Sequence, residues 1–190
     1  IKHLALTNID TKRMEEILDH GIKIVSNQVQ YSLIDTRPTV IMSEFCKKNN
    51  VSLLTYGTLC GGLLSENYLG VQEPMSRVEL NTASLQKYKN MIDAWGGWNL
   101  FQELLSSLDS IAKKHKVSIA NIATRYILDK QSVAGVIIGV RLGLSEHISD
   151  NKRVFNLKLD SEDDDIIESV ISKSENLYEL IGDCGDEYRQ

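Results

Sequence analysis

The chain has 190 residues, 42% of them apolar and 25% charged, which is typical of a globular chain and argues against a disordered one. Its net charge of −5 argues against nucleic acid or an anionic membrane as the main partner, and no apolar run approaches the roughly 20 residues of a membrane span. Three cysteines without metal-ligand spacing argue against a disulfide framework or a zinc site, so we expect the cytoplasm or another reducing compartment, such as an organelle stroma or matrix.

Short apolar runs alternate with amphipathic stretches in the first third of the chain. A first strand is expected at 3–7, followed by a helix over 11–20 and a second strand at 22–27. A second helix over 39–49 then leads to a third strand at 51–56. This alternation is typical of βα units with a parallel sheet.

A long connection follows the third strand and runs from residue 57 to about 99, a length that usually carries function. After it, helices are expected over 100–115 and 119–128, and a fourth strand at 133–138 is almost wholly apolar. The chain is expected to end with a loop that opens a short helix over 139–151, a helix over 161–174 and a flexible tail over 182–190.

Four βα units in tandem fit two architectures, a small open sheet or half of an eight-stranded barrel, and periodicity does not separate them. The chain begins at Ile1 and residues 3–7 already have the pattern of a strand, so we expect further residues upstream. No internal repeat or linker divides the sequence, which predicts a single domain over 1–190.

Polar, aromatic and glycine residues stand near the ends of the predicted strands, where parallel sheets bind ligands. Asn8 and Gln28 could satisfy a primary amide with paired donors and acceptors, and Tyr56 could supply a stacking face for a flat ring. Gly139, Arg141 and the helix that opens soon after them could bind a phosphate.

Four stretches in this order carry a resemblance to a known family. They are Thr-Asn at 7–8, SNQVQYS at 26–32, YGTLCGGLL at 56–64, and GVR at 139–141 followed by His147 and Asn151. In this order they resemble the aldo-keto reductase family, in which such motifs belong to barrel strands five to eight. The resemblance implies an α/β fold of the (β/α)8 TIM-barrel type, of which this chain would hold only the C-terminal four βα units, a half-barrel.

The same resemblance implies NADP(H) as the cofactor. Thr7, Asn8 and Gln28 would bind the carboxamide, and Tyr56 would stack on the nicotinamide. The resemblance also implies that the cofactor contacts Gly57, Thr58, Leu59 and Gly61. The 2′-phosphate and adenine would be held by Gly139, Arg141, His147 and Asn151.

The resemblance assigns no catalytic residue to this chain. The family's catalytic Asp, Tyr, Lys and His come from its first four βα units, and none of them is matched here, so the chain alone is expected to be inactive. Taken singly, each residue above also has a plain structural explanation, such as satisfying loop backbone or packing at a core rim. Only their joint order favours the cofactor interpretation.

Three functions stay open at this point. The chain could be part of an NADP-dependent carbonyl oxidoreductase that takes a small carbonyl substrate once a missing N-terminal half completes the barrel. It could instead be an inactive reductase-derived half-barrel that serves as a structural subunit, with a partner protein covering its open edges. A third hypothesis is an NADP-binding sensor.

Overall fold

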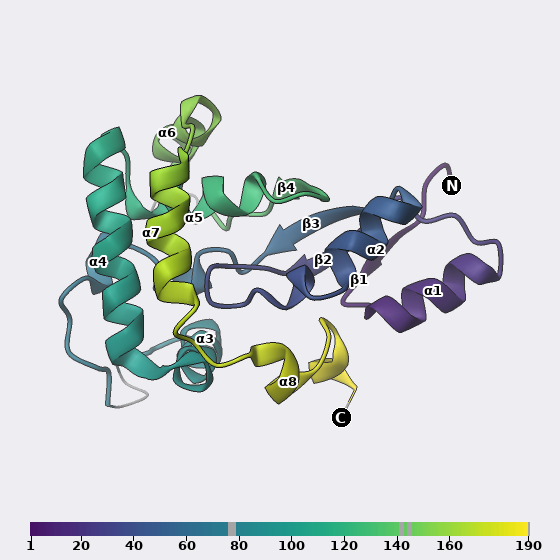
Figure 1. Ribbon diagram of the computed structural model, residues 1–190, viewed down its shortest axis with the longest axis horizontal. Helices are drawn as coiled ribbons and strands as arrows, with labels where there is room; N and C mark the ends of the chain where they lie inside the picture. The colour runs from purple at the N-terminus through teal and green to yellow at the C-terminus, as the bar shows by residue number, and fades with distance from the viewer. Residues whose placement is uncertain (76–78, 141–142, 144–145, 190) are drawn as a thin grey trace. The chain divides into compact units, whose positions relative to one another are not determined.

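The computed structural model describes residues 1–75, 79–140, 143 and 146–189, which belong to two compact units. The sheet unit comprises Ile1–Thr58, Ile127–Ile137 and Asn176–Gln190, and the helical unit comprises Leu59–Tyr126 and Ile138–Glu175. Figure 1 shows the elements of both units in sequence colours. Each unit is described by itself below.

The sheet unit is built on a four-stranded parallel sheet with the order β1-β2-β3-β4. Its strands are β1 (Ala5–Thr7), β2 (Ser26–Gln30), β3 (Ser52–Tyr56) and β4 (Val133–Val136). Helices lie between successive strands, which the parallel direction of the strands requires. The predicted α/β class with a parallel sheet is thus confirmed.

The position of β2 differs from the prediction. The strand was expected over the apolar residues 22–27, but it forms at Ser26–Gln30, so Gln28 lies within the strand and not after it. The backbone of β2 pairs on both sides, with Thr7 opposite Gln28 and Gln30 opposite Tyr56. Its position therefore follows from its two neighbours, because the side chains of this strand are mostly polar and give little local strand signal.

One face of the sheet is covered by α1 (Thr11–Asp19) and α2 (Met42–Asn49) (Figure 1). Met14 of α1 and Met42 of α2 are fully buried in a core cluster with Val29 and Leu53 of the sheet. Both helices have clear local ends. The Asp10 side chain accepts a hydrogen bond from the Arg13 amide at the start of α1, and α2 ends at Asn50, whose φ is 55°.

The helical unit contains α3 (Ala83–Trp95), α4 (Gly97–His115), α6 (Ile148–Asn151) and α7 (Ser161–Ile171). It also holds α5 (Ile119–Leu128) except for its last two residues, and these bounds match the predicted 119–128. Figure 1 shows α4 and α7 side by side, and the two are in contact. Fully buried side chains of this unit's core include Phe101, Leu104, Leu105, Leu108, Ile122 and Ile167.

The connection after β3 contains a helix that was not predicted. The residues expected to form one irregular stretch from 57 to about 99 include α3, and α4 begins at Gly97 and not at residue 100. The turn between these helices is tight, because a Cβ added to Gly96 would lie 2.5 Å from the Cδ2 atom of Leu100. Thr82 caps α3 by accepting from the Leu85 amide at 3.1 Å, and this cap is the sequence signal that could have revealed the helix.

The chain closes in the sheet unit with α8 (Leu177–Ile181) and a short 3-10 helix at Asp186–Tyr188. The sequence predicted a flexible tail over 182–190. In the structure Asp183 and Cys184 are buried, and Cys184 belongs to the core cluster of the sheet unit. Over the ranges that the structure describes, no helix has both the length and the apolar character needed to cross a membrane.

Candidate functional site at the strand ends

Three residues named by the sequence analysis lie close together on neighbouring strands: Asn8 directly after β1, Gln28 in the middle of β2 and Tyr56 at the end of β3. The backbone amide of Asn8 donates to the carbonyl oxygen of Gln28 at 2.9 Å. The hydroxyl of Tyr56 donates to Oδ1 of Asn8, also at 2.9 Å. A backbone bond therefore joins Asn8 to Gln28, and a side-chain bond joins Asn8 to Tyr56.

The backbone conformation of Asn8 is part of this arrangement. Its φ is 53°, in the left-handed region, which asparagine tolerates better than most residues with a Cβ. The turn follows directly on Thr7, which lies opposite Gln28 in the sheet and is exposed. Because the side chains of Asn8, Gln28 and Tyr56 are each partly exposed, the group can contact a ligand.

The donor and acceptor set suits a primary amide on a flat ring. A hydroxyl and two side-chain amides, from Thr7, Asn8 and Gln28, offer both hydrogen-bond donors and acceptors. The ring of Tyr56 offers an aromatic face beside them, and its hydroxyl is bonded to Asn8.

The turn after β3 has a structural role of its own. Gly57 adopts a φ of 70°, and the next residue, Thr58, is 1% exposed. The Thr58 hydroxyl donates to the carbonyl oxygen of Tyr31 at 2.9 Å, which ties the turn to the segment after β2. Thr58 thus stabilises the backbone of this turn, because its buried hydroxyl is bonded to Tyr31.

The remaining predicted residues lie in the helical unit. Leu59 is partly buried. Gly61 has a φ of 68°, and a Cβ added to it would lie 3.1 Å from Ser84 Oγ. Gly139 is exposed, and no heavy atom lies within 4 Å of the position its Cβ would take.

Around α6, the exposed His147 accepts with its carbonyl oxygen from the Asn151 amide at 2.8 Å. Arg141, which the sequence analysis placed near a phosphate, lies outside the described residues. The helical unit therefore presents His147 and Asn151 as neighbours on one short helix.

A buried ion pair that sequence analysis missed lies just after β2. Arg37 donates from Nε to Oδ1 of Asp35 at 2.8 Å and from Nη2 to Oδ2 at 3.0 Å. The two side chains are 1% and 0% exposed. Burial alone would lower the pKa of Arg37, but the hydrogen bonds and the charge of Asp35 outweigh it and raise that pKa.

The same guanidinium binds the C-terminal end of the described chain. Its Nη1 and Nη2 atoms each donate to one carboxylate oxygen of Glu187 at 3.1 Å. Burial would raise the pKa of Glu187, yet the bonds and charge from Arg37 keep it below its ordinary value. The two residues are 150 positions apart, and no local sequence pattern signals such a contact.

Residues after Glu187 reach the strand ends themselves. Nη2 of Arg189 donates to the carbonyl oxygen of Asn8 at 2.8 Å. The hydroxyls of Tyr188 and Tyr56 lie 3.0 Å apart. The C-terminal segment therefore borders the candidate site, which the predicted flexible tail did not anticipate.

One acidic cluster of the helical unit has metal-ligating residue types. Atoms of His115, Asp160 and Asp163 lie within 4.8 Å of one another, with His115 Nε2 2.6 Å from Asp163 Oδ2. Lys114 already donates to Asp160 and Asp163 at 2.8 Å each, and the two aspartates form the capping box of α7. Ion pairs and capping account for the contacts that these three side chains make.

One known protein family matches most of this chain. The profile described as "Aldo/keto reductase family" matches residues 1–172. The chain belongs to the aldo/keto reductase family. This assignment agrees with the α/β fold and its parallel sheet.

Several individual proteins are similar to the chain, at 25 to 28% sequence identity. Flagellar radial spoke protein 5 of Chlamydomonas reinhardtii is 28% identical over 130 residues, which are 68% of this chain and 24% of that protein. Aldo-keto reductase family 1 member C18 of Rattus norvegicus is 27% identical over 172 residues, 89% of this chain and 43% of that protein. A solved thermostable aldo-keto reductase, in complex with the inhibitor epalrestat, matches at a TM-score of 0.62 and 25% identity over 90% of this chain and 48% of its own. The chain thus spans half or less of the length of each of these proteins.

Proposed function

We propose that this chain is the C-terminal, NADP(H)-binding part of a carbonyl oxidoreductase of the aldo/keto reductase family. Its four parallel strands would be strands five to eight of a (β/α)8 barrel, the remainder of which lies in an N-terminal half. The coverage supports this assignment, because the chain matches 48% of a solved family member while 90% of its own length is matched.

The observation that carries the proposal is that hydrogen bonds hold Asn8, Gln28 and Tyr56 side by side on three adjacent strands. Thr7, Asn8 and Gln28 would bind the carboxamide of the nicotinamide, and the ring of Tyr56 would stack on it. When bound, the cofactor would supply a hydride. The residues of this chain would orient the ring so that one face meets the carbonyl carbon of the substrate.

The rest of the cofactor would be held by the predicted residues after β3 and after β4. Gly57 and Gly61 have no side chain, so their backbone amides could approach a bound molecule closely, and Leu59 would contact it. The guanidinium of Arg141 suits the 2′-phosphate of NADP, and His147 and Asn151 would contact the adenine.

Proton transfer to the substrate oxygen would come from the N-terminal half. The chain would select and orient the cofactor, and a small carbonyl compound would be the substrate. On this proposal the isolated chain binds NADP(H) weakly or not at all and is inactive, because half of its barrel is missing.

A binding titration of the full-length protein tests the proposal. NADPH should quench intrinsic fluorescence saturably, and Gln28→Leu should weaken binding about tenfold through the loss of the amide that pairs with the carboxamide. Gln131→Leu is the matched control, because Gln131 is an exposed glutamine in a turn of the same unit. A folded wild-type protein that does not bind NADPH, or a Gln28 variant that binds as the control does, would contradict the proposal.

The similarity to flagellar radial spoke protein 5 favours a second candidate, a structural subunit of a larger assembly. Family membership does not by itself compel activity, so a reductase-derived domain can be retained for its surfaces. Under this alternative the full-length protein co-purifies with a partner and reduces no carbonyl compound with NADPH. NADPH-dependent turnover by the purified protein alone would exclude it.

A further inference from the structure

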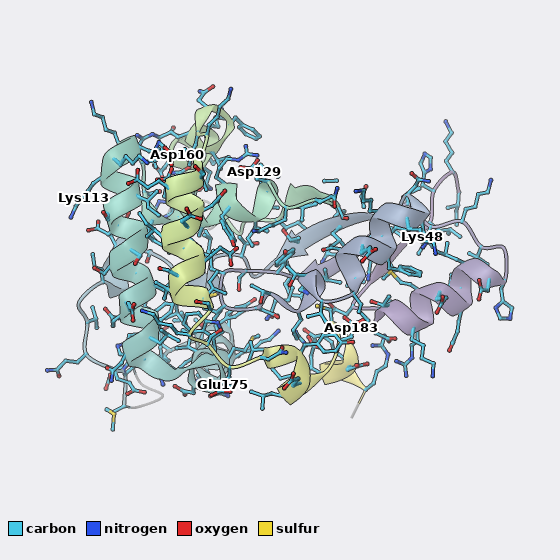
Figure 2. The ribbon with its side chains drawn as sticks, in the orientation of Figure 1. Lys48, Lys113, Asp129, Asp160, Glu175 and Asp183 are labelled. Carbon is cyan, nitrogen blue, oxygen red and sulfur yellow. The ribbon has the colours of Figure 1, made fainter. Side chains whose placement is uncertain are left out.

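The C-terminal segment Asp183–Arg189 is fastened to the sheet unit by several independent contacts. Asp183, which Figure 2 labels, accepts from the backbone amide of Thr11 at 2.7 Å. Cys184 is 1% exposed within the core cluster, and Glu187 accepts two hydrogen bonds from the buried Arg37. These contacts fix both the start and the middle of the segment.

The fastened segment approaches Asn8 very closely. A Cβ added to Gly185 would lie 2.3 Å from the carbonyl oxygen of Asn8, and the φ of this glycine is 103°. That carbonyl oxygen also accepts the bond from Arg189. The C-terminal segment therefore contacts the backbone of Asn8, whose φ is also positive, and holds it in place.

Tyr188 extends this contact to the side chains of the candidate site. A phenol carries one hydrogen, and the hydrogen of Tyr56 is directed to Oδ1 of Asn8. In the 3.0 Å contact between the two hydroxyls, Tyr188 is then the donor and Tyr56 the acceptor. A chain of hydrogen bonds therefore runs from Tyr188 through Tyr56 to Asn8.

We propose that Tyr188 is a positioning residue for the nicotinamide site, held in place by the Arg37–Glu187 ion pair. Its hydrogen bond fixes the ring of Tyr56, and through Tyr56 it fixes which end of the Asn8 amide faces a ligand. With Oδ1 of Asn8 engaged, the Nδ2 group is the one directed at the carboxamide oxygen. This inference rests on the function proposed above and adds the C-terminal segment to the parts that define the site.

The test compares two ligands that share the adenine end of the cofactor. NADPH carries the nicotinamide, whereas adenosine 2′,5′-bisphosphate lacks it. In the full-length protein, Tyr188→Phe should weaken NADPH about fivefold, the ratio expected for one hydrogen bond between neutral groups, and leave the affinity for adenosine 2′,5′-bisphosphate unchanged. Tyr178→Phe is the matched control, because Tyr178 lies on α8 of the same unit and no hydrogen bond links its hydroxyl to Tyr56.

A second variant tests the ion pair that holds the segment. Glu187→Gln keeps the shape of the side chain but removes its charge, so it should loosen Tyr188 and cause the same selective loss of NADPH affinity. Equal affinities of wild type and Tyr188→Phe for NADPH would overturn the inference, and so would a loss that affects both ligands alike. Tighter NADPH binding by Tyr188→Phe would also overturn it, since the segment would then obstruct the site. If the folded wild type fails to bind NADPH, the proposed function itself fails, a result distinct from any difference between variants.

Discussion

Replacement of Arg37 by methionine should be among the most destabilising changes in the sheet unit. Methionine keeps most of the length and the apolar part of the side chain, so the substitution mainly removes the charge and its hydrogen bonds. Asp35 is 0% exposed and would lose the bonds at 2.8 and 3.0 Å. It would keep the bond from Nε2 of Gln30 at 2.7 Å, and Glu187 would lose both of its bonds to Arg37.

The size of the effect follows from the uncompensated buried charge. Removing one partner of a buried ion pair costs about 3–5 kcal/mol. The remaining bond from Gln30 favours the lower end, so we expect Arg37→Met to lower the free energy of unfolding by about 3 kcal/mol. This cost falls on a protein whose total stability is only about 5–15 kcal/mol.

Urea unfolding followed by circular dichroism measures this change, with Arg13→Met as the matched control. Arg13 also binds an aspartate, Asp10 at 2.6 Å, but its side chain is 47% exposed, so water screens the pair and its loss should have little effect. A midpoint for Arg37→Met equal to that of Arg13→Met would refute the reasoning.

The effect should also depend on pH. Because folding lowers the pKa of Glu187, this group stabilises the wild type above its unfolded pKa of about 4.3, and the contribution is lost as the pH falls through the lower folded value. Arg37→Met lacks the part of that contribution that Arg37 supplies, so the difference between wild type and variant should narrow below about pH 4. A difference that widens on acidification would contradict the role given to Glu187.

Two further substitutions test the packing of each unit. Gly185→Ala should lower the free energy of unfolding by about 2 kcal/mol or more and release the C-terminal segment, because the new Cβ would lie 2.3 Å from the Asn8 carbonyl oxygen. The control Gly21→Ala, at a φ of 76° with open space around it, should lower the free energy of unfolding by only about 1 kcal/mol. Thermal unfolding measures both changes. Equal costs would contradict the close approach. In the helical unit, Phe101→Ala should cost about 3–5 kcal/mol in chemical denaturation because this side chain is 0% exposed, and Phe155→Ala, at a site 74% exposed, should stay within about 0.5 kcal/mol of wild type. A small effect at Phe101 would mean that the core of this unit is packed otherwise.

Local sequence signals predicted the helices well. The bounds expected for α5 are those observed, and α7 begins at Ser161 as predicted, with Asp160 and Asp163 forming its capping box. Caps and a period of 3.6 residues act within one or two turns, so they can be read from neighbouring residues alone. The missed α3 also carries such a cap, at Thr82.

The sequence by itself also named the residues that meet at the strand ends, since a parallel βα order brings the carboxyl ends of strands to one edge of the sheet. It did not determine the position of β2, because the register of a polar strand is set by the neighbours with which it pairs. Nor did it reveal that Glu187 and Tyr188 approach Arg37 and Tyr56. Those contacts join residues more than 130 positions apart, and only the tertiary fold decides which distant polar groups share a hydrogen bond.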